Sequence, residues 1–386
     1  MLLVSEPVLG DDEKAALAAV IESGWVTMGD RVGEFEQTFA RLHQADDAIA
    51  VGSCTAALHL ILHALGIGSG DEVLVPSLTF VATANSVVYV GARPVFVDIE
   101  SAEVPLMSLD EAEAKCTSRT KAVILVHFAG YLVDRDAWQS FARRKGLLLI
   151  EDAAHAPGLP EVGTYGEAMT TAEGGAVIAR DRGLRELIRQ SRAHGMTSGT
   201  RQRLSSRSAE YDVTMLGFNY RMDELRAALG LVQLKKLPAW NESRRQLATV
   251  YRALVAEHCP SVKIPFELRW PSAHHLMPIV LPPATNRQRV VDHLRKHDIQ
   301  TTIHYPPVHR LTYYRDLDPD VSLPRTEDMA HRELTLPLHP RMTASDVERV
   351  VQALSAALAA QYPMGAVARA SRRPRAGRLD DLGRSI

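Results

Sequence analysis

Short apolar runs alternate with longer amphipathic stretches over the first two-thirds of the chain. The runs are apolar at nearly every position, as expected for strands that helices cover on both faces. The stretches between them, such as 55–65 and 135–146, repeat their apolar residues every three or four positions, which is typical of helices. This succession predicts βαβ units and an α/β fold with a mostly parallel sheet. The predicted strands are 72–76, 94–99, 122–128, 147–152 and 176–179.

A long helical pattern that starts near Leu225 leads out of the predicted sheet and separates two parts of different character. We expect a large sheet domain over residues 1–240, a small α+β domain over 241–360, and a basic, disordered tail over 361–386. Contact between this arginine-rich tail and an anionic partner is the alternative. In the small domain we predict strands at 274–281 and 299–305 and helices at 286–297 and 345–358.

The charge balance argues against nucleic acid or an anionic membrane as partner. The chain has 44 Lys+Arg and 46 Asp+Glu, and its net charge of -2 offers little attraction to a polyanion. Its three cysteines are widely spaced, which indicates neither a disulfide framework nor a metal site and favours a reducing cytoplasm. No apolar run approaches the roughly 20 residues that span a bilayer, so we expect neither secretion nor a membrane-spanning segment.

Residues 52–58 could bind a phosphate group. They follow an apolar run and open a helix, which places the hydroxyls of Ser53 and Thr55 and free backbone N–H groups where an anion is favoured. An ordinary helix cap by Ser53 or Thr55 explains the same residues. A nucleophilic role for Cys54 is less favoured, because nothing nearby in the sequence supplies its base.

A pair of carboxylates, Glu151 and Asp152, ends another predicted strand. In an open α/β sheet this end faces the ligand, so one acid could hold a proton on a ring nitrogen. A metal ion or a simple turn cap is the alternative. Phe80 follows the strand 72–76 and could lie on a flat cofactor, with core packing as its alternative.

Two loops carry further candidates. Residues 217–222 present an amide, Asn219, and a guanidinium, Arg221, which could bind an anion or simply begin the next helix. His304 and His309 flank two prolines, which break the helical spacing of metal ligands, so we expect no metal site there.

Taken in order, seven motifs resemble the DegT/DnrJ/EryC1/StrS family of pyridoxal-phosphate-dependent sugar aminotransferases. They are GSCTAAL, GDEVLVPSLTFVATANSV, LIEDAAHA, EGGAVIA, GFNYRMDELRAALGLVQL, HYPPVH and ELTLPLHP, and the resemblance extends from about Ser5 to Leu358. It implies the type I aminotransferase fold, with a large, mostly parallel seven-stranded sheet domain, and a homodimer with shared active sites. It also implies pyridoxal 5'-phosphate as cofactor, a nucleotide-linked keto-sugar as amino acceptor, and glutamate or glutamine as amino donor.

The resemblance assigns residues to the phosphate end of the cofactor. Thr55 matches the hydroxyl residue that binds the phosphate in the family, with Ser53 and Cys54 beside it. Asn219 matches the residue that reaches the phosphate of the cofactor in the neighbouring subunit.

Three residues match positions around the cofactor ring. Phe80 matches the aromatic residue that stacks on it. Asp152 matches the acid that keeps the pyridine nitrogen protonated, so that the ring can accept electrons. His155 matches a position close to the ring and its phenolic oxygen.

The chain departs from the family at the Schiff-base lysine. Relatives follow a segment like 163–168 with a short strand and that lysine, before a glutamate-glycine-glycine turn. Here only four residues separate this segment from Glu173, and no lysine lies between Lys145 and Lys235. The shortened segment also holds no histidine, which dehydratase relatives use instead. We therefore assign no catalytic residue.

Transamination uses the lysine amine to hold the cofactor and to move a proton, so we expect weakened, noncovalent cofactor binding and impaired turnover. Loss of the strand would also leave the sheet one strand short. Three interpretations stay open. A lysine from elsewhere (Lys121, Lys235 or Lys236) restores activity, the chain is an inactive relative, or it is a noncatalytic partner or regulator that pairs with an intact paralogue.

Overall fold

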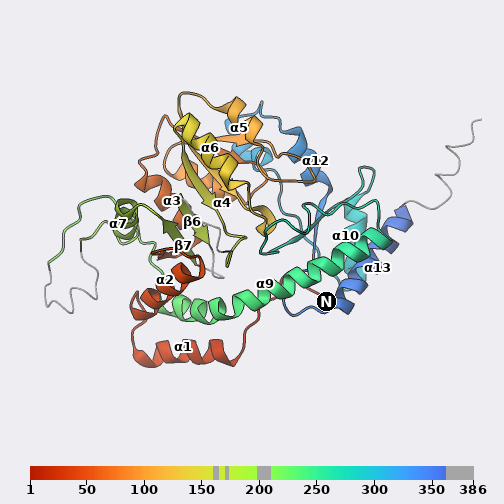
Figure 1. The fold of residues 1–386 in the computed structure, drawn as a ribbon, viewed down its shortest axis with the longest axis horizontal. Helices are drawn as coiled ribbons and strands as arrows, with labels where there is room; N and C mark the ends of the chain where they lie inside the picture. The colour runs from red at the N-terminus through yellow and green to blue at the C-terminus, as the bar shows by residue number, and fades with distance from the viewer. Residues whose placement is uncertain (160–164, 170–173, 198–209, 362–386) are drawn as a thin grey trace, which may run out of the picture.

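The computed structural model describes residues 1–159, 165–169, 174–197 and 210–361, and its centre is a seven-stranded sheet (Figure 1). The strand order is β3-β2-β4-β5-β6-β7-β1, and β7 alone runs antiparallel to its neighbours. The α/β fold with a mostly parallel sheet is thus confirmed. The strands are β1 (Ile49–Val51), β2 (Glu72–Pro76), β3 (Arg93–Val97), β4 (Thr120–Val126), β5 (Leu148–Asp152), β6 (Tyr165–Met169) and β7 (Gly175–Ala179).

Residues 165–169, in the segment where we expect the loss of a strand, form strand β6. Strand β6 pairs in parallel with β5 and antiparallel with β7, so both neighbours keep their backbone partners. The expectation that the sheet lacks one strand is therefore wrong, because five extended residues are enough to fill the gap. Residues 170–173 and the basic tail from 362 lie outside the described residues.

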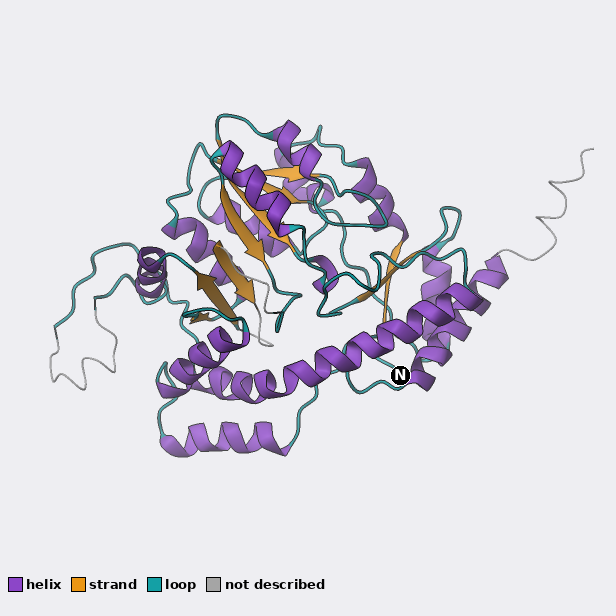
Figure 2. Cartoon of the chain, in the orientation of Figure 1, coloured by secondary structure: helices purple, strands orange, loops and turns teal. Residues whose placement is uncertain are grey.

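Helices cover both faces of the sheet (Figure 2). Helix α6 shows how the sequence fixes them, because it buries Trp138 and Phe141 against the sheet and turns its basic residues outward. The Asp134 side chain caps its first turn, and Gly146 ends it with a left-handed backbone at φ 67°. The helices of this part are α1 (Asp11–Ser23), α2 (Asp30–Leu42), α3 (Cys54–Ala64), α4 (Val81–Tyr89), α5 (Leu109–Lys115), α6 (Arg135–Lys145) and α7 (Arg182–Ser191).

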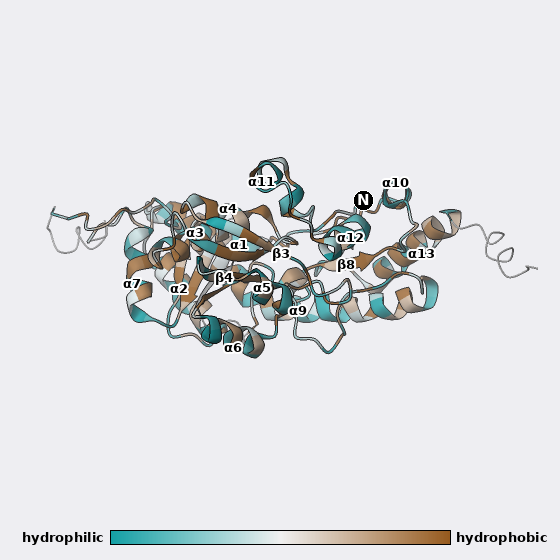
Figure 3. Ribbon diagram, turned by 90° about the horizontal axis from the view of Figure 1, so that it is seen from above, coloured by the Kyte–Doolittle hydropathy of each residue, from teal (hydrophilic) through white to brown (hydrophobic). Residues whose placement is uncertain are grey.

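The long helix α9 (Glu224–His258) connects the sheet domain to a small α+β domain. It packs against α1 and α2 near one end and against α13 near the other (Figure 1). Hydrophobic residues concentrate along the strands of the large sheet (Figure 3), and the small domain has a separate apolar cluster. Its elements are β8 (Met277–Val280), α10 (Arg287–Lys296), α11 (Thr312–Leu317), α12 (Pro324–Arg332), β9 (Glu333–Leu336) and α13 (Ala344–Gln361).

Segment 299–305 does not form the predicted strand. Within the described structure it makes only single bridges, from Ile299 to Leu2 and from Thr302 to Thr335. The strand that pairs with β8 is β9, which the sequence pattern did not predict. Short β-branched runs favour extended backbone, but they do not determine which of them has a continuous partner.

Candidate functional site

Asp152 lies at the carboxyl end of β5, held from two sides. Thr83 of α4 donates a hydrogen bond from Oγ1 to Oδ2 of Asp152 (2.8 Å), and the Cys54 thiol lies 3.7 Å from Oδ1. The backbone N–H of Ala154 donates to the same Oδ1 (3.3 Å). Burial raises the pKa of the Asp152 carboxyl, and these hydrogen bonds oppose the rise. These contacts hold the buried Asp152 carboxyl in one orientation. The sequence predicts that this carboxyl pairs with a ring nitrogen.

Glu151, the other acid of the pair, is buried on the opposite face of the strand. Its carboxylate contacts Nε2 of His127 (3.1 Å) and Nε of Arg135 (3.1 Å). Burial favours a higher pKa for Glu151, but His127 and Arg135 bring it below its ordinary value. Alternation along β5 therefore decides which acid faces the site, and it is Asp152.

The amino end of α3 borders a cavity of about 630 Å³. Ser53 caps the helix, because its Oγ accepts a hydrogen bond from the Ala56 N–H (3.1 Å). Thr55 lines the cavity together with Asn219 and Arg221. The structure thus brings three predicted anion-binding residues together, and it also confirms the capping alternative for Ser53. Arg226 of α9 is a second guanidinium on this cavity that the sequence did not single out.

Gly175 makes close contact between β7 and the start of α3 possible. A Cβ atom at this position would lie 2.6 Å from the carbonyl oxygen of Ser53 and 2.7 Å from the backbone nitrogen of Cys54. Both atoms belong to backbone, which cannot move aside as a flexible side chain can. Gly175, the second glycine after Glu173, therefore fixes how near the sheet comes to the predicted phosphate-binding turn.

Cys54 belongs to the surroundings of Asp152 and is not a nucleophile. Its side chain is buried, and burial followed by the charge of Asp152 raises the pKa of the thiol well above its ordinary value. The reactive thiolate is therefore disfavoured.

Phe80 presents an exposed aromatic ring, with 58% of its surface accessible. It stands at the start of α4, and its ring centroid lies 5.9 Å from that of Tyr305, which comes from the small domain. An aromatic ring this exposed is not explained by core packing. The predicted stacking face is therefore available to a flat ligand.

His155 lies between three segments. Its Nδ1 accepts a hydrogen bond from the Ala129 N–H (3.3 Å), and its Nε2 lies 2.9 Å from the Tyr305 hydroxyl. Its ring stacks on His275, with centroids 4.6 Å apart. Burial, and then the neighbouring His275, lowers the pKa of His155 well below its ordinary value, so the imidazole is neutral.

The two histidines of the proline-containing loop turn to different partners. Nδ1 of His304 pairs with Thr335 Oγ1 (2.8 Å), whereas His309 contacts Ser77 Oγ (2.7 Å) and Glu327 Oε1 (3.1 Å). Among the described residues no group of three or more His, Cys, Asp or Glu side chains could hold a metal ion. In the same part of the chain, no helix is long and apolar enough to cross a membrane.

The lysines considered as substitutes lie away from Asp152. Lys121 is at the start of β4, whereas Asp152 pairs with the other end of that strand, Val126. Lys236 is engaged by Asp12 (3.1 Å) and Glu13 (2.8 Å) of α1. Its neighbour Lys235 is exposed on α9.

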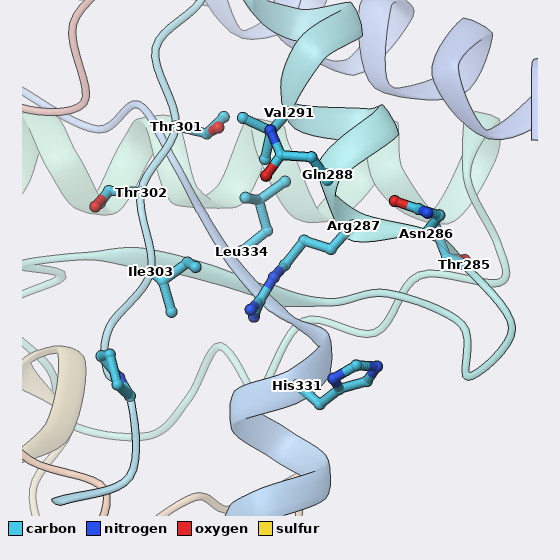
Figure 4. Close-up of a pocket in the computed structure, with 11 residues that line it drawn as sticks. Thr285, Asn286, Arg287, Gln288, Val291, Thr301, Thr302, Ile303, His331 and Leu334 are labelled. Atoms are coloured by element: carbon cyan, nitrogen blue, oxygen red, sulfur yellow. The ribbon is translucent and has the colours of Figure 1, made fainter. Parts of the chain in front are cut away.

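A second cavity, of about 520 Å³, lies in the small domain between the start of α10 and segment 301–306 (Figure 4). Arg287 extends into it and donates hydrogen bonds to the carbonyl oxygens of Ala330 (2.5 Å) and Glu333 (2.9 Å). Ala330 belongs to the last turn of α12, whose free carbonyl groups favour a positive charge. A structural role thus accounts for Arg287, and we assign this cavity no ligand.

The motif order and the geometry agree with a comparison against known families. A family model described as the DegT/DnrJ/EryC1/StrS aminotransferase family matches residues 7–355. The chain belongs to this family. The resemblance seen in the motifs is therefore confirmed over nearly the whole chain.

Solved structures that share the fold include aminotransferases. TlmJ from Streptoalloteichus hindustanus is 32% identical, with a TM-score of 0.86, and the match covers 94% of this chain and 100% of TlmJ. Helicobacter pylori PseC, an aminotransferase involved in the biosynthesis of pseudoaminic acid, is 28% identical, with a TM-score of 0.86 and coverage of 93% and 99%. NtdA from Bacillus subtilis, solved with bound cofactor PMP, is 28% identical, with a TM-score of 0.82 and coverage of 90% and 81%. These similarities confirm the type I aminotransferase fold.

Besides Arg226, two site residues were not assigned from the sequence. Thr83 lies four positions after Thr79, a helical spacing that could have placed both hydroxyls on one face. Tyr305 lies inside the motif HYPPVH, and its contact with His155 joins segments 150 residues apart, which no local pattern indicates.

Proposed function

We propose that this chain binds pyridoxal or pyridoxamine 5'-phosphate by noncovalent contacts and takes a nucleotide-linked keto-sugar as partner substrate. Asp152 and Phe80 fit the ring-binding part of such a cofactor, because they offer a buried carboxyl and an accessible aromatic face. When bound, the pyridine ring supplies an electron sink for a substrate carbon. Glutamate or glutamine is the amino donor that the family resemblance favours.

The cavity at the amino end of α3 supports the phosphate and nucleotide parts of this proposal. Arg221 and Arg226 both line it together with Thr55, so two guanidinium residues and a helix start border the same cavity. Phosphate oxygens are favoured in such surroundings, and a sugar nucleotide carries a diphosphate.

The same site does not fit covalent attachment of the cofactor. The sequence has no lysine from 146 to 234, and the lysines on α9 and at the start of β4 are placed elsewhere. His155 is neutral, and both of its ring nitrogens already have partners, so it offers no free base. We therefore propose that the chain alone binds its ligands without efficient amino transfer. The observation that carries this proposal is an intact ring-binding pair, Asp152 and Phe80, without a lysine beside it.

A visible spectrum with added pyridoxal phosphate, then borohydride reduction and peptide mass mapping, tests the proposal. We expect reversible binding that dialysis removes, and no reduced adduct on any peptide. The matched control is Asp152→Asn, which should lose most of this binding. A stoichiometric adduct on one lysine would show that covalent chemistry persists and would overturn the proposal.

A second candidate function is a noncatalytic partner, and exposed apolar side chains near Asn219 favour it. Tyr89, Tyr211 and Leu216 have 55%, 56% and 74% of their surface accessible. We propose that a second subunit covers this face, either another copy of the chain or an intact family member. Sedimentation of the wild type and of Leu216→Asp measures whether the chain pairs and whether this face is needed for it. A monomer at all concentrations would refute pairing with another copy, and a monomer in the presence of an intact family member would refute the pairing altogether.

A further inference from the structure

The hydrogen bonds around His155 determine where its single ring proton lies. A neutral imidazole carries one N–H group and one bare nitrogen. The backbone N–H of Ala129 donates to Nδ1, so Nδ1 is the bare nitrogen and Nε2 carries the proton. Nε2–H therefore donates to the oxygen of Tyr305, 2.9 Å away. His155 has no further N–H group to offer a ligand.

This assignment leaves the Tyr305 proton free. Burial raises the pKa of the Tyr305 phenol above its ordinary value, so the hydroxyl is protonated at neutral pH. Its oxygen already accepts from His155, and no acceptor for its own O–H lies among the described residues. The Tyr305 ring stands 5.9 Å from that of Phe80, at the face where a flat ligand fits. Tyr305 is thus a donor at the edge of the ring-binding site.

A buried set of hydrogen bonds holds the Tyr305 loop against the end of β2. Val308 N–H donates to the Ser77 carbonyl (3.0 Å), and His309 N–H donates to Ser77 Oγ (3.2 Å). Nε2 of His309 donates to Glu327 Oε1 (3.1 Å), so its Nδ1 accepts from the Ser77 hydroxyl (2.7 Å). Ser77 and His309 are 0% and 2% exposed. Because no substrate can reach it, this serine has a structural role and is not a nucleophile. Tyr305 is therefore fixed relative to Phe80, three residues after Ser77.

We propose that Tyr305, and not His155, donates the hydrogen bond to the phenolic oxygen of the bound pyridine ring. The family resemblance places His155 near that oxygen, but the geometry gives His155 the task of orienting the Tyr305 hydroxyl. This inference rests on the proposed cofactor binding. It makes Tyr305 a ligand-binding residue of this chain and His155 a positioning residue.

The test uses 4-deoxypyridoxine 5'-phosphate, which keeps the ring nitrogen, the phenolic oxygen and the phosphate but has no aldehyde. Its affinity for the full-length chain is measured by calorimetry for wild type and Tyr305→Phe. We expect about 10-fold weaker binding by the variant, since a hydrogen bond to a charged oxygen is lost. The absorbance of the bound probe should also show that its phenol ionises at a higher pH in Tyr305→Phe, because the donor that favours the anion is gone.

Tyr251→Phe is the matched control. Its hydroxyl donates to the Pro337 carbonyl (2.8 Å) in the small-domain core, so removing it should leave probe affinity unchanged. Equal affinity of wild type and Tyr305→Phe, or an unshifted probe phenol, overturns the inference and leaves the proposed cofactor binding intact. Absence of binding by the wild type overturns the proposed function as well, so the two failures are distinguishable.

Discussion

Thr83 and Asp152 are joined by a 2.8 Å hydrogen bond that links helix α4 to the end of strand β5. Thr83 is completely buried, and its hydroxyl is in turn 2.8 Å from that of Thr79. The carboxyl is therefore oriented by its surroundings before any ligand arrives, which reduces the ordering that binding requires.

Asp152→Asn should abolish most cofactor binding without harming the fold. Burial raises the pKa of Asp152, so its ionised form is disfavoured in the folded chain, and the isosteric amide removes that charge. We expect a melting temperature equal to or above that of the wild type, and probe affinity lower by 10-fold or more, about 1.4 kcal/mol. Thermal melts and calorimetry measure both. Strong destabilisation by this substitution would contradict the assignment of Asp152 as a buried acid that serves a ligand and not the fold.

Gly175→Ala should disturb the phosphate-binding turn, because the added methyl group meets the Ser53 backbone at 2.6 Å. A loss of about 1–3 kcal/mol of unfolding free energy is expected from such overpacking. Gly33→Ala is the control, because its Cβ in helix α2 meets nothing within 4 Å, and it should be neutral or stabilising. Denaturant unfolding measures the free energy of unfolding of both variants. Equal losses in the two variants would contradict the close contact at Gly175.

Glu333 should make stability fall as pH rises. Burial raises the pKa of its carboxyl from 4.5 to about 8, although Thr335, His304 and Arg287 oppose the rise. Between these values the folded chain holds a proton that the unfolded chain releases, so its contribution is full below pH 4.5 and is lost through pH 8. The slope from this group is at most about 1.4 kcal/mol per pH unit. Urea unfolding at pH 6 and pH 8 should show a smaller decline for Glu333→Gln, and an identical decline would refute this origin.

Ser77→Ala should loosen the Tyr305 loop. The substitution leaves Nδ1 of buried His309 without its donor, which costs about 1–3 kcal/mol. Faster release of the deoxypyridoxine probe in stopped-flow measurements is expected as well. Ser191→Ala is the comparison, because that buried hydroxyl bonds only within and beside its own helix, to Leu187 and Met215. Probe release should stay at the wild-type rate there, and an equal acceleration would point to general instability.

Much of the fold follows from local pattern. The predicted strands at 72–76, 122–128 and 147–152 correspond to β2, β4 and β5 within two residues, because buried parallel strands are continuous apolar runs. The same rule failed for 299–305, whose residues find only single bridging partners. Strand pairing is a long-range property that composition does not encode.

The candidate site was predictable where a motif fixes a backbone position. Asp152 and Phe80 occupy strand and helix ends that the motif order identifies, and the structure brings them to one edge of the sheet. The role of His155 was not predictable, because it depends on a proton whose place is set by Ala129 and Tyr305. Such tautomer choices come from contacts between distant segments.

Helix α9 contributes buried residues to an apolar cluster in each of the two parts of the chain. Its 35 residues give a rod about 50 Å long, anchored on α1 and α2 at one end and on α13 at the other. A tilt of about 5° at the anchored end displaces the far end by about 4 Å. The Tyr305 loop is hydrogen-bonded to Ser77 at the end of β2, so such a tilt would shift the small-domain core on α13 and leave the Tyr305–His155 contact in place.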